Sequence, residues 1–201
     1  MEPTSRAASA SAGEITTLLR AWSRGDEAAR DRLAALVYAD LRRLAGARLR
    51  HGASPTLNPS DLVNEAFIRI LGQEARFQGR AHFFAVAAVM IRRVLVDRAR
   101  ARRARKRGGE AIRVDLSDAN PAEGPREVDL IALDHALQEL ERLDAEQARV
   151  VELRYFGGLT FEEIAEVTGT SVSTAKRSWR SARAWLHWQL RPADRPPGGA
   201  T

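Results

Sequence analysis

The sequence contains no cysteine, which excludes disulfides, thiolate metal sites and a cysteine nucleophile. No two of its histidines have the i, i+4 spacing that places a metal-binding pair on one helical face. A glycine-rich phosphate loop, a Gly-x-Ser-x-Gly nucleophile elbow and the carboxylate cluster of a metal-dependent nuclease are also missing. We therefore expect a protein that is not an enzyme and that binds neither a cofactor nor a metal ion.

Long apolar runs are missing as well. No stretch approaches the roughly 18 to 20 uninterrupted apolar residues that a membrane-spanning helix needs. Residues 1–13 are rich in Ala and Ser but have no apolar run typical of a secretory signal. The sequence thus predicts a cytoplasmic protein without a membrane partner. Its formal net charge of +6 indicates that the partner is another polyanion, a nucleic acid.

Proline and glycine divide the 201 residues into two helical blocks. We predict an all-α fold, in which two small helical domains are joined by a flexible acidic linker and the C-terminal domain contains a helix-turn-helix. The predicted parts are a disordered tail at 1–13, a first domain at 14–107, a linker at 108–127, a second domain at 128–191 and a disordered tail at 192–201. The linker holds five acidic residues against two arginines. No run of the chain is typical of a strand.

The first domain is predicted to contain four helices, placed by start signals and by apolar spacing. A short helix at about 14–23 precedes a second one, which follows Gly25-Asp26. The third begins at Asn58, whose side chain can cap it. The fourth, at about 80–107, is apolar in its first half and almost purely basic in its second.

The second domain is also predicted to contain four helices, beginning with one from Leu130 to Leu143. Capping residues and glycines mark the limits of the other three. In chain order these signals are Asp144, Gly157, the Thr160 and Glu163 capping box, Gly169 and Ser171. The last helix continues to about Leu190.

The stretch "TFEEIAEVTGTSVSTAKRSW" has the pattern of a helix-turn-helix. Such a motif needs a small residue at the helix crossing, here Ala165, and a turn residue that tolerates left-handed backbone, here Gly169. The apolar residues that would lock the two helices together are Ile164, Val172, Ala175 and Trp179. The residues predicted to face a DNA major groove are Ser173, Thr174, Lys176, Arg177 and Arg180. The alternative is a plain helical hairpin with a solvated basic face.

The wider stretch "VVELRYFGGLTFEEIAEVTGTSVSTAKRSWRSARAWL" resembles the fourth conserved region of bacterial RNA polymerase sigma factors, especially the extracytoplasmic-function (ECF) type. The resemblance covers about residues 130–190. It implies that the outward residues just named read the promoter element near minus thirty-five. A very similar helix-turn-helix occurs in LuxR-type regulators, so the first domain has to decide between the two families.

"NPSDLVNEAFIRIL" resembles the most recognisable helix of the second conserved region of sigma factors. The resemblance implies that Asp61, Asn64 and Glu65 dock on the clamp helices of the polymerase beta-prime subunit. Helical spacing agrees, because positions 61, 64, 65 and 68 share one face. The alternative is a capped surface helix whose acidic residues interact only with its own dipole.

"RFQGRAHFFAVAAVMIRRVLVDRARARRARKRGG" resembles the stretch with which sigma factors recognise and melt the minus-ten element. Unpaired bases need an aromatic surface or a pocket, and the adjoining backbone needs cations. The residues implied to contact minus-ten DNA are Phe77, Arg80, His82, Phe83, Arg92, Arg93, Arg98 and Arg100. Phenylalanines at helical spacing are usually core, so we expect Phe83, Phe84 or both to be packed inside.

These resemblances together predict a sigma factor of the ECF or ECF-like type, which directs promoter recognition, DNA melting and transcription initiation. The implied partners are the RNA polymerase core, through its beta-prime clamp helices and beta flap, and promoter DNA, with an anti-sigma protein as a further candidate. By the same resemblance, the acidic linker threads toward the polymerase cleft; on composition alone it is a spacer. The alternative functions are a self-standing LuxR-like regulator and a nucleic-acid-processing or RNA-binding protein.

Overall fold

A computed structural model describes residues 4–49, 58–72, 77–105, 111–115 and 127–191 of the chain. In the first domain the helices are α1 (Thr4–Trp22), α2 (Glu27–Leu49), α3 (Pro59–Leu71) and α4 (Arg80–Arg105). Two predicted start signals are confirmed: the Asp26 carboxylate accepts a hydrogen bond from the backbone N–H of Ala29, and the Asn58 amide oxygen accepts one from Ser60. The start of α1 lies at Thr4, within the segment predicted to be a tail, where alanine, the strongest helix former, is frequent.

Two short strands correct the prediction that the chain has none. β1 (Arg113–Asp115) and β2 (Glu127–Asp129) pair antiparallel, with Val114 opposite Val128. Both valines are buried, and the backbone N–H of Leu130 donates to the carbonyl of Ile112 at 2.9 Å. The strands were missed because three residues are too short for a period-two pattern and their pairing is not local. Residues 116–126, the centre of the predicted linker, lie outside the described part of the chain.

The second domain contains α5 (Leu130–Leu143), α6 (Ala145–Val151), the π-helical turn η1 (Glu152–Phe156), α7 (Phe161–Thr168) and α8 (Val172–Gln189). The predicted caps are confirmed: Asp144, Thr160 and Ser171 each accept a backbone N–H from the first turn of the following helix. The single helix predicted between Asp144 and Gly157 changes to π-helical geometry in its last turn.

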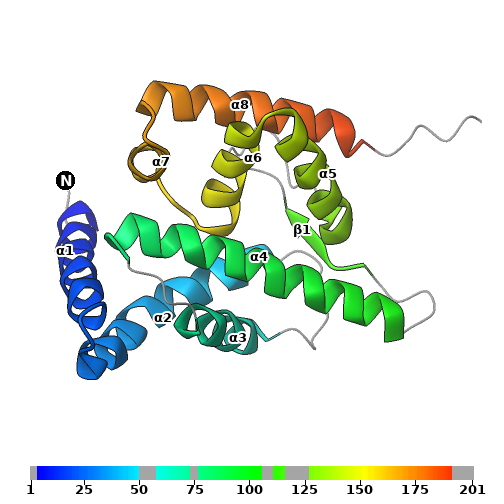
Figure 1. The fold of residues 1–201 in the computed structure, drawn as a ribbon. Coiled ribbons are helices and arrows are strands. Elements are labelled where there is room, and N and C mark those ends of the chain that lie inside the picture. Colours follow the sequence, from blue (N-terminus) through cyan, green and yellow to red (C-terminus); the bar gives the residue numbers. More distant parts are fainter. Residues whose placement is uncertain (1–3, 50–57, 73–76, 106–110, 116–126, 192–201) are drawn as a thin grey trace, which may run out of the picture.

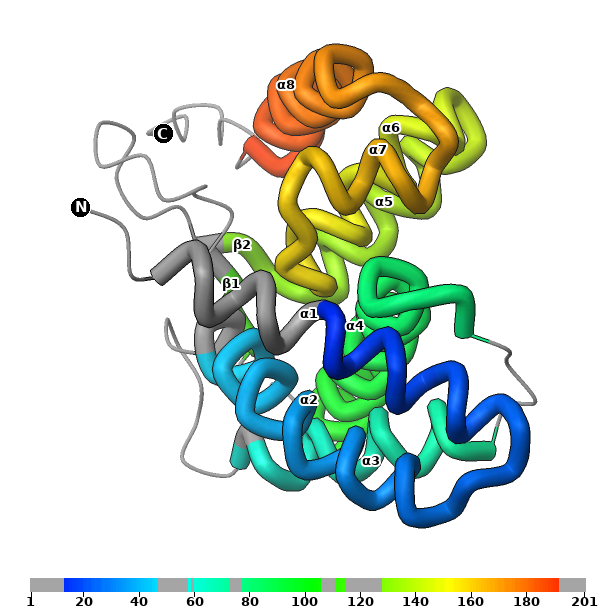
Figure 2. The backbone as a smooth tube through the Cα atoms, turned by 90° about the vertical axis from the view of Figure 1, so that its left-hand side faces the viewer, coloured from blue at the N-terminus to red at the C-terminus, as the bar shows by residue number. Residues whose placement is uncertain are grey.

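α4 is the element around which the whole molecule is arranged. Figure 1 shows α1 to α3 on one side of it and α5 to α8 on the other, and the turned view in Figure 2 shows the same order. α4 packs on α3 in the first domain, and on α5, η1 and α7 in the second. One continuous cluster of buried apolar side chains therefore extends from Ile15 in α1 to Leu186 in α8. The all-α prediction is confirmed, and in this structure the helices of the two predicted domains pack against each other.

Candidate nucleic-acid interface

The residues predicted to form a helix-turn-helix lie in α7, at Gly169 and in α8. The capping box is complete, since Glu163 N–H donates to the Thr160 hydroxyl and Thr160 N–H donates to the Glu163 carboxylate. Gly169 has left-handed backbone, with φ of 68° and ψ of 24°, as the sharp turn requires. Ala165, Ala175 and Trp179 are buried where the two helices cross. The turn therefore fixes how the outer face of α8 is presented.

The outer face of α8 is polar and basic. Ser173, Lys176, Arg177 and Arg180 are exposed and Thr174 is half-buried. The Ser171 hydroxyl, which caps α8, lies 2.8 Å from that of Ser173 and 2.9 Å from that of Thr174. The Lys176 ammonium lies over the Phe161 ring, 5.8 Å from its centroid. The five residues that the sequence placed together thus form one surface, with its lysine held toward α7.

Among the residues that the structure describes, Glu162, which lies beside this surface, has a carboxyl group with a lowered pKa. Hydrogen bonds from its own backbone N–H and from the Thr160 hydroxyl lower its pKa below the ordinary value, and the charges of Lys176 and Arg154 act in the same direction. Glu162 therefore stays ionised at neutral pH and adds a negative charge next to the basic face.

The polar face of α3 contains Asp61, Asn64 and Glu65 as predicted. Asp61 and Asn64 are exposed, whereas Glu65 is half-buried and accepts hydrogen bonds from Arg69 on its own helix and from Arg98 of α4. Ile68 lies one turn further along this face with 69% of its surface exposed. The exposed part of this face therefore combines polar groups with one apolar side chain.

The aromatic residues predicted to stack on DNA bases are packed inside the first domain. Phe77 is 3% exposed to solvent and Phe83 is 0% exposed. Their ring centroids lie 5.3 Å apart edge to face, and Phe77 stacks on Trp22 at 5.4 Å. Burial in this aromatic cluster is what an apolar ring favours, so neither Phe77 nor Phe83 is available to a base in this structure. This burial counts against the predicted contact of these two residues with minus-ten DNA.

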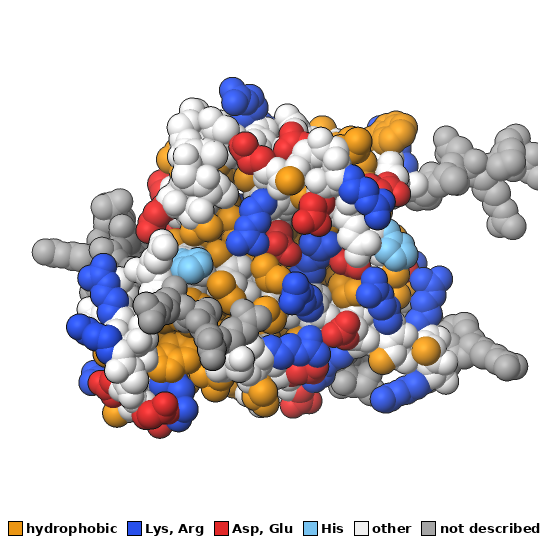
Figure 3. All heavy atoms as spheres, viewed as in Figure 1, with side chains coloured by type: hydrophobic (Ala, Val, Ile, Leu, Met, Phe, Trp, Pro, Cys, Tyr) orange, Lys and Arg blue, Asp and Glu red, His pale blue; other side chains and the backbone are white. Residues whose placement is uncertain are grey.

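The remaining residues assigned to minus-ten DNA all lie on α4, and most of them contact acidic side chains. Figure 3 shows Lys and Arg side chains along the middle and right of the molecule, with Asp and Glu side chains among them. Arg80 forms an ion pair with Glu163 and its guanidinium lies 4.5 Å from the Phe84 ring centroid. Arg98 donates to Glu65 at 2.8 and 3.0 Å. His82 is half-buried and its Nδ1 accepts the backbone N–H of Gln78 at 3.2 Å.

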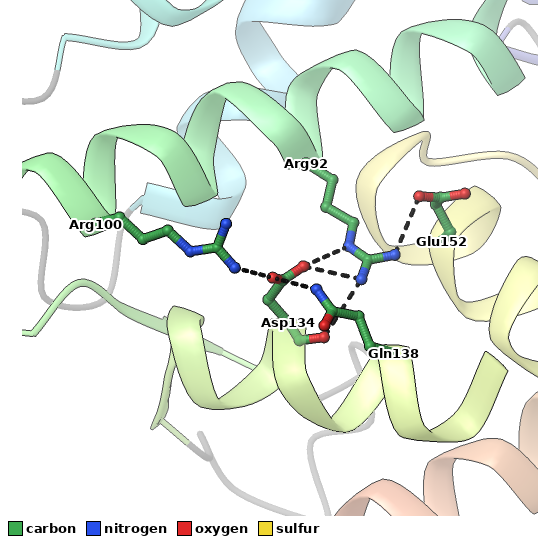
Figure 4. A network of polar contacts seen from close by, with 5 residues as sticks. All are labelled: Arg92, Arg100, Asp134, Gln138 and Glu152. Atoms are coloured by element: carbon green, nitrogen blue, oxygen red, sulfur yellow. Dashed lines mark hydrogen bonds and ion pairs between the residues drawn. The ribbon is translucent and has the colours of Figure 1, made fainter. Parts of the chain in front are cut away.

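Arg92 is the most enclosed of these arginines, with 14% of its side chain exposed. It donates from Nε and Nη2 to Asp134 Oδ1, at 3.1 and 2.9 Å, and from Nη1 to Glu152 Oε1 at 3.3 Å (Figure 4). Arg100 and Gln138 donate to the second oxygen of Asp134, each at 3.0 Å. Arg93 is exposed and lines a cleft of ≈ 620 Å³ beside this network.

Asp134 was missed by the sequence analysis, although one signal pointed to it. Positions 130, 133, 134 and 137 follow the i, i+3, i+4, i+7 spacing of a buried helical stripe, and three of them are leucine. An aspartate in such a stripe is buried only when it has partners, and Asp134, 6% exposed, has three. Glu152 and Glu163, which pair with Arg92 and Arg80 of α4, gave no comparable signal of burial in the sequence.

Two absences follow from the described residues alone. Within them, no group of three or more His, Cys, Asp or Glu side chains could hold a metal ion. None of the helices that the structure describes is long and apolar enough to cross a membrane.

Comparison with known proteins identifies the family. The model of the family described as ECF sigma factor matches residues 12–192, which is most of the chain. The chain belongs to the ECF sigma factor family. The family predicted from the three quoted resemblances is thereby confirmed, and sigma factors are transcription factors rather than enzymes.

One solved structure related to this ECF sigma factor family member is the co-crystal structure of the sigma factor RpoE in complex with the anti-sigma factor NepR from Bartonella quintana. It is 21% identical in sequence, and the match covers 82% of this chain and 98% of that chain. The TM-score of 0.37 is too low for any argument about this chain to rest on that likeness. A search of curated protein sequences found no match.

Proposed function

We propose that this chain binds core RNA polymerase and directs it to specific promoters, with the polymerase holding the two DNA-binding surfaces of the chain at a fixed spacing. The observation that carries the proposal is that one chain of the ECF sigma factor family combines a largely exposed polar face on α3 with an exposed basic face on α8. In this proposal Asp61, Asn64 and Glu65 dock on the beta-prime clamp helices.

The α8 face is proposed to read the minus-thirty-five element. Lys176, Arg177 and Arg180 provide cations for phosphates and guanine edges, and Ser173 and Thr174 provide hydroxyls. An N-capped helix that starts with small polar residues and continues with basic ones can enter a major groove with its first turns.

The basic residues of α4 are proposed to bind the backbone next to the minus-ten element, with His82 and Arg80 at the start of the helix. Melting of the duplex would be driven by binding energy alone, because the sequence has no phosphate-binding loop for nucleotide hydrolysis. Since Phe77 and Phe83 are in the core, recognition of unpaired bases is assigned to exposed groups and not to these rings.

The direct test is run-off transcription with core polymerase and the purified chain, followed by mapping of the start sites. We expect defined transcripts that core alone does not produce. The absence of any specific transcript would contradict the proposal. Tight binding to an operator without polymerase would instead favour a self-standing regulator of the LuxR-like kind.

The docking face is tested by the charge reversal Asp61→Lys. We expect it to raise the Kd for core at least about thirtyfold, since loss of a buried interfacial charge pair costs about 2 kcal/mol or more. Asp61 is exposed, so the fold should tolerate the change, and Glu65→Lys can be added once circular dichroism shows that α3 is intact. Asp31→Lys is the matched control, because Asp31 is 74% exposed on a different helix. Equal core affinity for Asp61→Lys and Asp31→Lys would exclude this face.

A further inference from the structure

Three carboxylates of the second domain bind Arg80, Arg92 and Arg100, which the proposed function assigns to promoter DNA. Asp134 binds Arg92 and Arg100, Glu152 binds Arg92, and Glu163 binds Arg80. The partners are separated by 34 to 83 residues in the chain, so each pair joins α4 to the other domain. Figure 4 shows Arg92 and Arg100 reaching from α4 to the same aspartate on α5.

The apolar part of the domain contact is as close as glycine allows. A Cβ atom placed on Gly157 would lie 3.0 Å from the Cβ of Ala88 in α4. One placed on Gly158, whose φ is +64°, would lie 2.3 Å from Leu44 Cδ2 in α2. Two consecutive glycines thus let the backbone after η1 lie directly against two helices of the first domain. The ion pairs between the domains therefore accompany a close-packed contact of backbone and apolar side chains.

A carboxylate and a phosphate compete for the same edge of a guanidinium group. Both are oxyanions that accept a pair of parallel N–H donors, and one edge can serve one of them at a time. Arg92 has three of its donor nitrogens on Asp134 and Glu152 and only 14% of its side chain exposed. In this arrangement Arg92 cannot reach a DNA backbone, and Arg80 and Arg100 reach it only by giving up a partner.

We propose that the packing of the second domain on α4 is an autoinhibitory contact, in which Asp134, Glu152 and Glu163 occupy the arginines that the open chain uses for the minus-ten backbone. The proposal rests on the proposed function and adds its regulation: the free chain is closed and binds DNA weakly, and binding to core polymerase separates the domains. We refer to the pairs of Asp134, Glu152 and Glu163 with α4 as the latch.

The opening of the latch can be measured by fluorescence energy transfer between dyes on the two domains. The chain has no cysteine, and Ala28 in α2 and Ala184 in α8 are exposed, so Ala28→Cys with Ala184→Cys gives two labelling sites. We expect energy transfer to be high in the free labelled chain. It should fall in the latch variant, which combines Asp134→Asn with Glu152→Gln. It should also fall when core polymerase is added to the labelled chain with an unmodified latch.

The same latch variant should bind DNA more tightly in the absence of polymerase. On a fluorescent duplex of arbitrary sequence at fixed ionic strength, we expect the Kd to fall at least about tenfold, because released arginines add phosphate contacts and their counterion-release term. The matched control is Glu139→Gln with Glu146→Gln, which removes the same charge but breaks only contacts within the second domain, to Gln189 and Ser178. A similar gain in the control would mean that net charge, and not the latch, sets the affinity, and would overturn the proposal.

Glu163→Gln keeps the test decisive if the double variant does not fold. Glutamine also completes a capping box at this position, so α7 should persist while the charge opposite Arg80 is lost. Unchanged energy transfer, or unchanged DNA affinity, in a folded latch variant would overturn the autoinhibitory contact. Specific run-off transcripts from the same chain would still support the proposed function. If energy transfer and DNA affinity change as expected but no specific transcript forms, the contact between the domains stands and the proposed function is overturned.

Discussion

Phe83 and Ile68 lie on the two packed helices α4 and α3 and test opposite roles for an apolar side chain. Phe83 is fully buried in the aromatic cluster, and Ile68 is 69% exposed. We expect Phe83→Ala to lower the free energy of unfolding by about 3–5 kcal/mol, the usual range for a buried aromatic residue. Ile68→Ala should change it by no more than about 0.5 kcal/mol, since little is buried there.

Denaturant unfolding of both variants checks the stabilities, and core binding provides the second measurement. Ile68→Ala should weaken the complex with polymerase, because Ile68 is on the proposed docking face, without changing the fold. If Phe83→Ala were as stable as the parent chain and lost only the ability to melt DNA, the ring would act at the promoter, and its placement in the core would be wrong.

The sequence predicts burial well where only one helix has to be considered. The i, i+4, i+8 spacing of Leu62, Ala66 and Ile70 predicts one buried stripe on their helix, and all three are buried. The partners of Arg92 depend on a contact between domains, and the acids that bind it are 42 and 60 residues away in the chain. No local spacing encodes that contact, so Arg92 was predicted only as part of an exposed basic face.

Helices α7 and α8 show which features of an element are local. The capping box at Thr160, the left-handed turn at Gly169 and the cap at Ser171 each satisfy a helix terminus with side chains or backbone from the same few residues. All three were predictable for that reason. β1 and β2 were not, because each is stabilised by hydrogen bonds to the other strand, which lies beyond residues 116–126 in the chain.

Gly169 allows the turn of the helix-turn-helix to be tested by itself. A Cβ there would meet nothing within 4 Å, so Gly169→Ala should cost only the conformational strain of a positive φ, about 1–2 kcal/mol. Gly169→Asn should cost less, because asparagine adopts left-handed backbone more readily. Thermal unfolding monitored by circular dichroism provides the comparison. Equal stability of the glycine, alanine and asparagine forms would show that the turn is not left-handed in solution.

At the scale of the whole molecule, the main feature that the sequence did not predict is the closed arrangement of the two domains. The sequence predicted two domains on a flexible linker, and it placed the helices within them except for the start of α1 and the π-helical turn η1. The contact between them is made of backbone close to Leu44 and Ala88 and of ion pairs along α4. Because the same arginines suit either carboxylates or phosphates, one sequence is compatible with a closed free chain and with an open, DNA-bound one.

The closed arrangement can be tested by a double-mutant cycle that does not touch any charge. Gly158→Ala introduces a methyl group 2.3 Å from Leu44 Cδ2, and Leu44→Ala removes the atom that it meets. If the domains are packed, Gly158→Ala should destabilise the parent chain more than the Leu44→Ala background, with a coupling free energy of at least about 0.5 kcal/mol. The strain of the positive φ is present in both backgrounds and cancels.

Urea unfolding of the four forms measures the coupling, and Gly169→Ala in the same two backgrounds is the control, since its methyl group points into open space. Coupling as small for Gly158→Ala as for the control would show that the two domains do not touch in the free protein, and the latch would then have no basis.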